Sequence, residues 1–321
     1  MNWRMKARIQ NAVARLPESV SYPAYYWIQR RFGGLRRVDP LKGFRKFLNA
    51  AERLERVGAS PVGAEFLEVG TGRQVNTPLA AWLCGARGIT TVDLNPYLKE
   101  ELVRDCVASI ARRAEEVRGL LGKRLHPGRL EALLDLAGRP WRFGELLELC
   151  AIRYRAPADA GRLDIPDGSH DFHVSFNVFE HVSPAALGAI LREGNRVLRE
   201  SGLFVHRVDY SDHFSHKDPS ISPVNFLQYS AEEWQRIAGN RFMYMNRLRV
   251  DDFMELFREA GHDIVLVDSD VSASVEALLD RGDLVLDAGF RQKSRQVLAT
   301  TGSWFVTRRG RAQWQSGGGM S

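Results

Sequence analysis

Short apolar segments alternate with amphipathic helical patterns over most of the chain. From residue 64 onward, six segments have the apolar and β-branched content of buried strands. They are "AEFLEV" (64–69), "GITTVDL" (88–94), "HDFHVSF" (170–176), "GLFVHRVDY" (202–210), "HDIVLVD" (262–268) and "SWFVTRR" (303–309). Strands that alternate with helices form mainly parallel sheets covered by helices, so the pattern predicts an α/β fold.

Two long stretches interrupt this alternation. Residues 99–150 are too long for one crossover and predict a helical insertion, and residues 211–250 predict a substrate lid. We expect one domain over residues 61–311 and a flexible tail over residues 312–321.

The first sixty residues differ from the rest in pattern and in charge. Helical patterns there are broken at Pro17, at Pro23 and in "FGGLRRVDP" (32–40). Residues 1–60 hold thirteen Lys or Arg against four Asp or Glu, whereas the whole chain has a formal net charge of only +6. We therefore expect a basic helical N-terminal cap.

The first predicted helix is amphipathic. Its apolar face carries Met5, Ile9, Ala12, Val13 and Leu16, and its flank carries Arg4, Arg8 and Arg15. Such a helix suits an anionic membrane surface or a nucleic-acid backbone. It also suits a helix docked on the domain with a solvated basic side, and both interpretations stay open.

Composition indicates a globular protein of the cytoplasm. Of the 321 residues, 44% are hydrophobic and 26% are charged, which is enough to bury a full core. The three cysteines, Cys84, Cys106 and Cys150, lack the spacing of a disulfide framework or a zinc site. No apolar stretch approaches the length of a membrane span.

One unit carries the signature of an adenosine-containing cofactor. A strand ends at Val69 and is followed by Gly70 and Gly72, and Asp93 lies 21 positions after Gly72 at the end of the next strand. A carboxylate there can accept hydrogen bonds from ribose hydroxyls, in a dinucleotide or a nucleoside site. Val75 stands where the dinucleotide fingerprint needs its third glycine, which disfavours a pyrophosphate.

Glu68 separates these cofactors further. Its carboxylate, two residues before Gly70, would repel a pyrophosphate and would favour a ligand that carries an ammonium group. S-adenosyl-L-methionine has such a group and a sulfonium cation.

Four segments together resemble the motifs of the class I S-adenosylmethionine-dependent methyltransferases, especially those acting on small molecules. They are "FLEVGTG" (66–72), "TTVDLNP" (90–96), "PADAGRLDIPDGSHDFHVSFNVFEHV" (157–182) and "NRVLRESGLFVHRV" (195–208). The resemblance implies a Rossmann-like doubly wound sheet with its last strand antiparallel, and S-adenosyl-L-methionine as cofactor. Arg73 and Gln74 depart from the family, which has small residues there.

The resemblance also implies cofactor-binding residues. Glu68, Gly70 and Gly72 would receive the methionine end, Asp93 the ribose, and Leu94 and Asp159 with Ala160 the adenine. Asn177 ends the strand at 170–176 and so lies at the carboxyl edge, where doubly wound sheets bind ligands.

Methyl transfer to a hydroxyl needs a held nucleophile and a base. His181 follows the strand at 170–176, Asp209 ends the strand at 202–210, and His213 lies four residues further on. We take these three as candidate catalytic residues. The segment "DYSDHFSHKD" (209–218) also crowds residue types that bind divalent metals, but polar loops collect them by chance, and we expect no metal site.

The predicted lid mixes aromatic, amide and guanidinium groups. Candidate substrate-binding residues there are Arg241, Tyr244, Asn246 and Arg247. The mixture suits a polar ring-shaped or anionic acceptor, such as a sugar, although ordinary packing of a surface segment would look alike.

These observations predict a cytoplasmic methyltransferase. The acceptor atom would be a hydroxyl, or secondarily an amine, of a small polar molecule such as a saccharide or a specialised metabolite. Peripheral association with an anionic membrane through residues 1–60 is a further expectation. An RNA methyltransferase is an alternative, although "SFNVFEHV" (175–182) lacks the Asn-Pro-Pro-aromatic arrangement of base-modifying relatives. A cofactor-binding or membrane-associated protein without turnover is the other.

Overall fold

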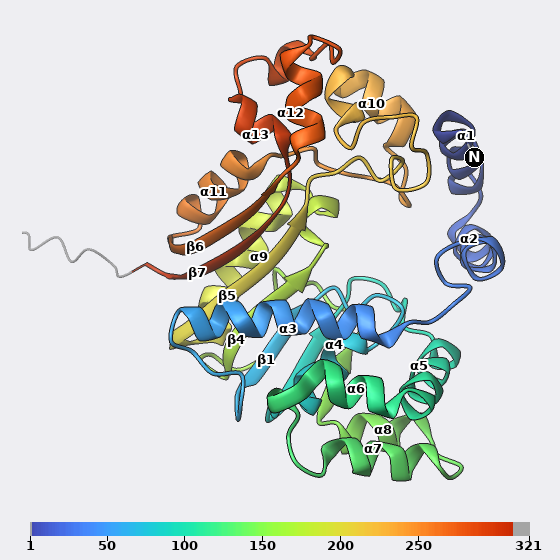
Figure 1. Cartoon of the computed structure of the whole chain (residues 1–321), viewed down its shortest axis with the longest axis vertical. Coiled ribbons are helices and arrows are strands. Elements are labelled where there is room, and N and C mark those ends of the chain that lie inside the picture. The colour runs from blue at the N-terminus through green and yellow to red at the C-terminus, as the bar shows by residue number, and fades with distance from the viewer. Residues whose placement is uncertain (1, 311–321) are drawn as a thin grey trace, which may run out of the picture.

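The computed structural model describes residues 2–310. A seven-stranded sheet runs through it in the order β3-β2-β1-β4-β5-β7-β6 (Figure 1). Its strands are β1 Glu65–Val69, β2 Gly88–Val92, β3 Ile152–Arg155, β4 His170–Phe176, β5 Leu198–Asp209, β6 His262–Val271 and β7 Thr300–Arg309. The first five strands are parallel, and β7 runs antiparallel between β5 and β6. The predicted doubly wound sheet with an antiparallel last strand is confirmed.

The helices follow the strands in the alternation that the pattern predicted. They are α1 Trp3–Ala14, α2 Glu18–Phe32, α3 Pro40–Arg56, α4 Asn76–Leu83, α5 Glu100–Arg112, α6 Ala114–Leu121, α7 Arg129–Ala137, α8 Phe143–Leu149, α9 Pro184–Val197, α10 Ala231–Ala238, α11 Val250–Glu259, α12 Ala273–Asp280 and α13 Arg295–Ala299. Short 3₁₀ helices include η2 Phe179–His181 and η3 Asn225–Gln228.

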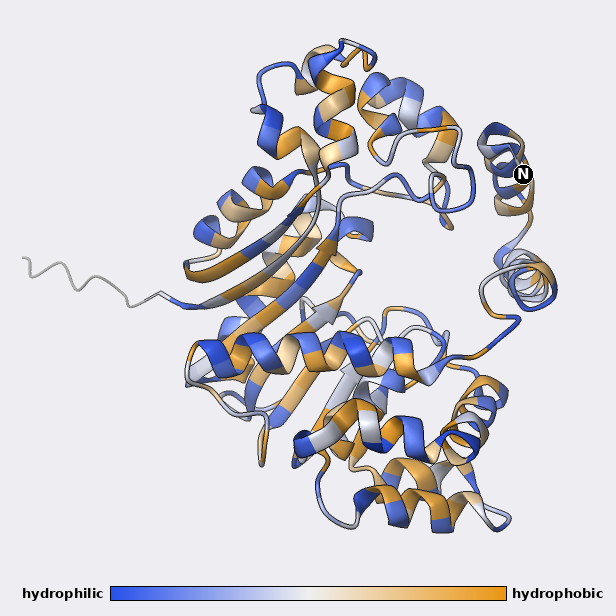
Figure 2. Ribbon diagram, in the orientation of Figure 1, coloured by the Kyte–Doolittle hydropathy of each residue, from blue (hydrophilic) through white to orange (hydrophobic). Residues whose placement is uncertain are grey.

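Helices cover both faces of the sheet. One face packs against α3, α4 and α5, where Phe44, Leu79 and Cys106 are fully buried. The other packs against α9 and α11, where Leu191 and Phe257 are buried. Figure 2 shows hydrophobic residues along the strands and a mostly hydrophilic outer side on α3.

The third helix, α3, lies within the residues predicted as the N-terminal cap (1–60). α3 buries an apolar stripe that includes Leu41, Phe47 and Leu54, and therefore belongs to the domain core and not to an appended cap. Asp39 is the N-cap residue of α3, and its side chain accepts a hydrogen bond from the Leu41 N–H (3.3 Å). The appended N-terminal segment therefore ends before Asp39.

The stretch predicted as an insertion forms four helices, α5 to α8, that carry the chain from β2 to β3. The short strand β3 escaped prediction because "IRYR" is half exposed at the edge of the sheet and carries two arginines. The helical content is confirmed, and the segment is an enlarged crossover. The predicted tail at 312–321 lies outside the described residues.

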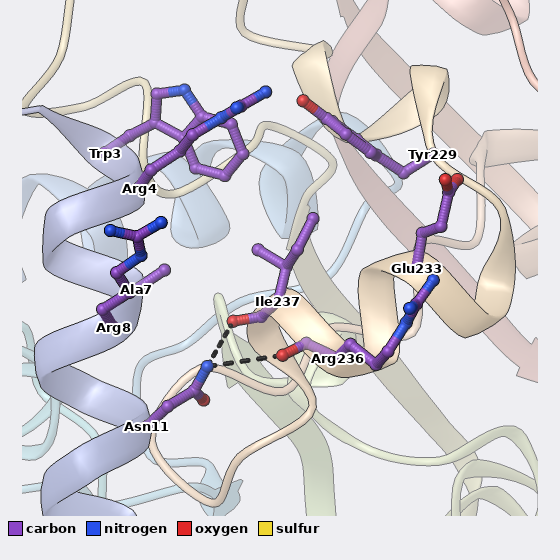
Figure 3. A pocket seen from close by; sticks show the side chains of 9 residues that line it. All are labelled: Trp3, Arg4, Ala7, Arg8, Asn11, Tyr229, Glu233, Arg236 and Ile237. Atoms are coloured by element: carbon purple, nitrogen blue, oxygen red, sulfur yellow. Dashed lines mark hydrogen bonds between the residues drawn. The ribbon is translucent and has the colours of Figure 1, made fainter.

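α1 docks on the segment between β5 and α11. The Trp3 N–H donates to Asp218 Oδ2 (2.7 Å), and Asn11 Nδ2 donates to the carbonyls of Arg236 and Ile237 at the end of α10 (3.3 and 3.1 Å; Figure 3). A cavity of about 430 Å³ remains between α1 and α10.

The face by which α1 docks differs from the apolar face seen on the helical wheel. Trp3, Ala7 and Gln10 are buried, whereas Met5 and Ile9 are 51% and 44% exposed. The helix is docked, as one interpretation held, but its apolar stripe faces outward. Among residues 2–310, no helix combines the length and apolar content that a membrane span requires.

Candidate functional site

The loop after β1 opens at the carboxyl edge of the sheet. Gly70 and Gly72 have φ angles of +89° and +66°, a region that residues with a side chain rarely adopt. A Cβ on Gly70 would lie 2.5 Å from Val178 Cγ2, whereas a Cβ on Gly72 would meet no atom within 4 Å. The loop is thus closed toward β4 and open on the side where a ligand can approach.

Asp93 ties this loop to the end of β2. Its Oδ2 accepts a hydrogen bond from the Gly72 N–H (2.9 Å), and its Oδ1 accepts one from the Asn95 N–H (3.1 Å). Burial raises the pKa of Asp93, and these two N–H groups oppose that rise. Each carboxylate oxygen keeps a further acceptor position, which ribose hydroxyls require.

The residues predicted for the adenine lie beside Asp93. The Ala158 N–H donates to the Asp93 carbonyl (2.9 Å), which brings the 158–160 turn to the end of β2. Asp159 is exposed there and accepts from the Gly161 N–H (2.8 Å), Ala160 is buried, and Leu94 is exposed. The tertiary structure therefore brings these residues together, and their contacts with adenine remain a prediction.

Asn177 carries an unused acceptor at the same edge. It follows β4 with a φ of +60°, and its N–H donates to the Arg207 carbonyl (2.9 Å). Its side-chain Oδ1 is buried without a hydrogen-bond partner among the described residues. An unpaired buried acceptor is costly, and the ammonium group of a methionine moiety would satisfy it.

Glu68 points into the protein. Its Oε2 accepts a hydrogen bond from Thr91 Oγ1 (2.6 Å), which in turn accepts from Thr71 Oγ1 (2.7 Å). Burial raises the pKa of Glu68 to about 7. The carboxyl group thus links the glycine loop to β2, and its predicted contact with the methionine end stays a prediction.

α2 contacts both the glycine loop and the 211–250 segment. Tyr25 stacks on Phe242 with ring centroids 4.2 Å apart, and the Arg73 guanidinium lies 5.0 Å from the Tyr26 ring and 5.3 Å from the Tyr97 ring. Cation–π contacts of this kind hold a guanidinium against aromatic faces. Arg73, which departs from the family pattern, is therefore engaged by the N-terminal cap.

The candidate catalytic residues converge next to this edge. His181 ends η2, and its Nδ1 lies 2.8 Å from the Tyr244 carbonyl, to which it can only donate. Its Nε2 is therefore the nitrogen with a free lone pair. The surrounding protein and the neighbouring His213, whose ring centroid lies 5.0 Å away, lower the pKa of His181. The ring is thus neutral near pH 7 and can take a proton.

Asp209 ends β5 beside these rings. Its Oδ1 accepts hydrogen bonds from the N–H (2.8 Å) and Oγ (2.6 Å) of Ser211. Its Oδ2 lies 3.5 Å from His213 Nε2 and 3.9 Å from His216 Nε2. Burial favours a higher pKa for Asp209, but His213 and Ser211 outweigh it and hold the pKa well below its usual range.

Two further groups of the site escaped sequence reasoning. Glu180 is buried with both carboxyl oxygens unpartnered among the described residues, and burial raises its pKa to about 8. Burial lowers the pKa of Lys46 on α3, against the opposing charges of Glu180, Glu68 and Asp209. In the sequence, Lys46 stood out only as a charged residue within the apolar stripe of α3, between Gly43 and Ala50.

The predicted substrate residues have varied surroundings. Arg241 lies 3.2 Å from Glu18 on α2, and Tyr244 supplies the carbonyl that orients His181. Asn246 donates to the carbonyls of Phe179 and Val182 (2.8 and 2.9 Å), which uses both of its amide hydrogens.

Arg247 is also engaged within the chain. It donates to the carbonyls of Phe226 and Tyr229 (3.1 and 2.7 Å). Asn246 and Arg247 therefore hold the 211–250 segment in place. Substrate binding by Arg241 and by the Tyr244 side chain stays a prediction.

Part of the chain is similar to known methyltransferase domains. Residues 144–206 match a family model described as a methyltransferase domain. No curated protein matches the chain at a significant level. Among solved structures, the chain is similar to a proposed methyltransferase of Haloferax volcanii in complex with the Trm112 methyltransferase activator, with 17% identity over 89% of this chain and 95% of that one and a TM-score of 0.46.

Two other solved structures are similar to a comparable degree. A proposed sarcosine dimethylglycine methyltransferase from Galdieria sulphuraria is 17% identical over 83% of this chain and 86% of that one, with a TM-score of 0.44. The cyclase SpnF is 15% identical over 83% and 81%, with a TM-score of 0.44. None of these likenesses bears on the acceptor. The match to a methyltransferase domain ends inside β5, and the sheet around it has the antiparallel last strand, between β5 and β6, that the resemblance to the class I S-adenosylmethionine-dependent methyltransferases predicted.

Proposed function

We propose that this protein is an S-adenosylmethionine-dependent methyltransferase that acts on a hydroxyl oxygen of a small polar acceptor, with a saccharide as the favoured class. The observation that carries the proposal is His181, whose Nδ1 donates to the Tyr244 carbonyl and whose Nε2 is free to accept a proton. An amine acceptor would need no such base in its neutral form, whereas a hydroxyl must lose its proton during transfer.

S-adenosyl-L-methionine supplies an electrophilic methyl carbon, whose bond to sulfur breaks with its electron pair left on sulfur as the acceptor oxygen forms the new C–O bond. Asp93, Asp159 and Leu94 would hold its nucleoside end, and the Gly70–Gly72 loop and Asn177 its methionine end. His181 Nε2 takes the hydroxyl proton, and the Asp209–His213 pair beside it holds the acceptor. Positioning of this kind supplies a large part of the rate of group transfer.

The experiment that tests the proposal replaces His181 with glutamine. We expect turnover to fall by about 100-fold, because a positioned general base contributes at least that much. The affinity for S-adenosyl-L-methionine, measured by calorimetry, should stay unchanged. Turnover is followed as transfer of a labelled methyl group to a panel of nucleotide sugars, glycans and RNA.

His126→Gln is the matched control, since His126 is exposed in the connection between α6 and α7. Full turnover by His181→Gln would show that His181 is not the base. Label found in RNA and in none of the saccharides would show that the acceptor class is wrong.

We further propose that the protein works in the cytoplasm at an anionic membrane surface, bound through α1 and α2. On α2, Trp27 and Phe32 are 60% and 73% exposed and contact each other with ring centroids 5.7 Å apart. Around them and along α1 lie arginines that form no ion pair within residues 2–310. They are Arg4, Arg8, Arg15, Arg31, Arg36 and Arg37. Exposed apolar groups flanked by free guanidinium groups complement anionic lipid headgroups.

A vesicle assay tests this surface. The full chain should sediment with vesicles of phosphatidylglycerol and phosphatidylcholine and not with phosphatidylcholine alone. The double variant Trp27→Ser, Phe32→Ser should bind at least about tenfold more weakly, since each large side chain contributes on the order of 1.5 kcal/mol when buried. Val285→Ser is the control, because Val285 is equally exposed elsewhere. Equal sedimentation of all three proteins, or binding to RNA without binding to vesicles, would contradict the proposal.

A further inference from the structure

Three potential metal ligands meet in the loop after β5. Asp209, His213 and His216 each have one ligand atom within 4.8 Å of those of the other two. Asp209 and His213 are mostly buried, and His216 is half exposed, so the group is reachable from solvent. The sequence analysis expected these residue types to have gathered by chance.

Contacts within the loop after β5 hold the side chains of Asp209, His213 and His216 close together. Asp212 is fully buried, its Oδ1 accepts a hydrogen bond from the Phe214 N–H (2.9 Å), and its Oδ2 accepts one from Asn225 Nδ2 (3.0 Å). Phe214 is buried against Trp3, with ring centroids 5.5 Å apart. This turn directs His213 and His216 back over the end of β5.

The carboxylate of Asp209 is oriented for coordination. Ser211 donates twice to Oδ1, which leaves Oδ2 facing Nε2 of both imidazoles at 3.5 and 3.9 Å. Ligand atoms about 2.1 Å from one ion can lie at most about 4.2 Å apart, so both separations fit a shared ion. Hydrogen bonds that orient a ligating carboxylate in this way are typical of metal sites.

An independent observation is the state of His213. Its Nε2 is buried and makes no hydrogen bond of normal geometry within residues 2–310, and its nearest acceptor is Asp209 Oδ2 at 3.5 Å. An imidazole nitrogen left without a partner beside a carboxylate and a second imidazole is satisfied by an ion that all three share.

We propose that Asp209, His213 and His216 bind one divalent transition-metal ion. Two imidazoles and one carboxylate suit zinc, manganese or iron, whereas magnesium and calcium prefer oxygen ligands throughout. The contact between Ser211 Oγ and His216 Nε2 (2.8 Å) gives way to the ion, and the two hydrogen bonds from Ser211 to Asp209 remain.

The consequence of the ion rests on the proposed function. Three protein ligands leave coordination positions open, and there the ion would hold oxygen atoms of the acceptor next to His181. A coordinated hydroxyl loses its proton more readily, and His181 Nε2 is the group that takes it. A vicinal diol of a saccharide is the acceptor chemistry that such a site fits.

The test measures metal binding and not turnover. The full chain, stripped with a chelator and dialysed, is titrated with Co²⁺ by visible absorption and with Zn²⁺ by calorimetry. We expect one ion per chain, and at least about a 100-fold weaker affinity in His216→Ala, because one of three ligands is lost. His126→Ala is the control for an exposed histidine.

His216 is half exposed, so its replacement should leave the melting temperature and the affinity for S-adenosyl-L-methionine unchanged. The inference is overturned if the wild-type protein binds both ions only as weakly as exposed surface histidines do. It is equally overturned if His216→Ala binds the ions as tightly as the wild type. Because no acceptor is needed, metal binding can succeed where the hydroxyl proposal fails, and the reverse result is equally distinguishable.

Discussion

Replacement of Asp93 with alanine should weaken the binding of S-adenosyl-L-methionine by about a thousandfold. A carboxylate that accepts hydrogen bonds from two ribose hydroxyls contributes about 1.5–3 kcal/mol for each bond, and about 4 kcal/mol in total corresponds to that loss. The same substitution removes the acceptors of the Gly72 and Asn95 N–H groups, so the glycine loop also loses its anchor.

Calorimetric titration with S-adenosyl-L-methionine and S-adenosylhomocysteine measures this loss. Asp93→Asn keeps one oxygen acceptor and should fall between the wild type and Asp93→Ala, which separates the charge from the anchoring of the loop. Asp135→Ala is the matched control, since Asp135 is an exposed carboxylate on α7. Tight cofactor binding by Asp93→Ala would show that the nucleoside end is held elsewhere.

Replacement of Arg249 with methionine should lower the free energy of unfolding by about 4 kcal/mol. The Arg249 side chain is fully buried, and it donates to the carbonyls of Tyr210 (2.8 Å), Leu298 (3.0 Å) and Thr300. Each buried carbonyl left without a donor costs about 1–3 kcal/mol. These carbonyls lie just after β5 and where α13 passes into β7, so Arg249 joins segments that are distant in sequence.

Urea unfolding of the full chain measures the change. Arg249→Lys should lie between the wild type and Arg249→Met, because one ammonium group cannot reach every carbonyl. Arg258→Met, on the exposed side of α11, should change stability by less than about 0.5 kcal/mol. A loss of under about 1 kcal/mol in Arg249→Met would mean that water replaces the guanidinium.

Arg249 also illustrates what escapes sequence reasoning. In the sequence it is one of several arginines near the start of a helix, and nothing local marks it as buried. Asn246 and Arg247 look like binding residues for the same reason, although hydrogen bonds to backbone carbonyls engage them within the chain. Donor groups do not reveal in the sequence whether a ligand or the protein itself will accept from them.

The strands and the unit from Gly70 to Asp93 were predictable because their signals are local. Periodicity indicated six of the seven strands, and the short spacing from Gly70 through Asp93 marks a single strand–helix–strand unit. A doubly wound sheet then brings the carboxyl ends of neighbouring strands to one edge by geometry alone. The half-exposed β3 had too weak a pattern, and α12 with α13 extends a connection that carried no comparable signal.

The sequence by itself determined the fold class, and it predicted the cofactor and the edge of the sheet at which that cofactor would bind. Only the tertiary structure decided that α1 docks through Trp3 and leaves Met5 and Ile9 outside, and that His181 meets Asp209 and His213. The physical reason is that periodicity reports which residues share a face of one element. Which face is buried, and which side chains converge, depends on partners far along the chain, such as Asp218 for α1 and the Asp212 turn for the two histidines.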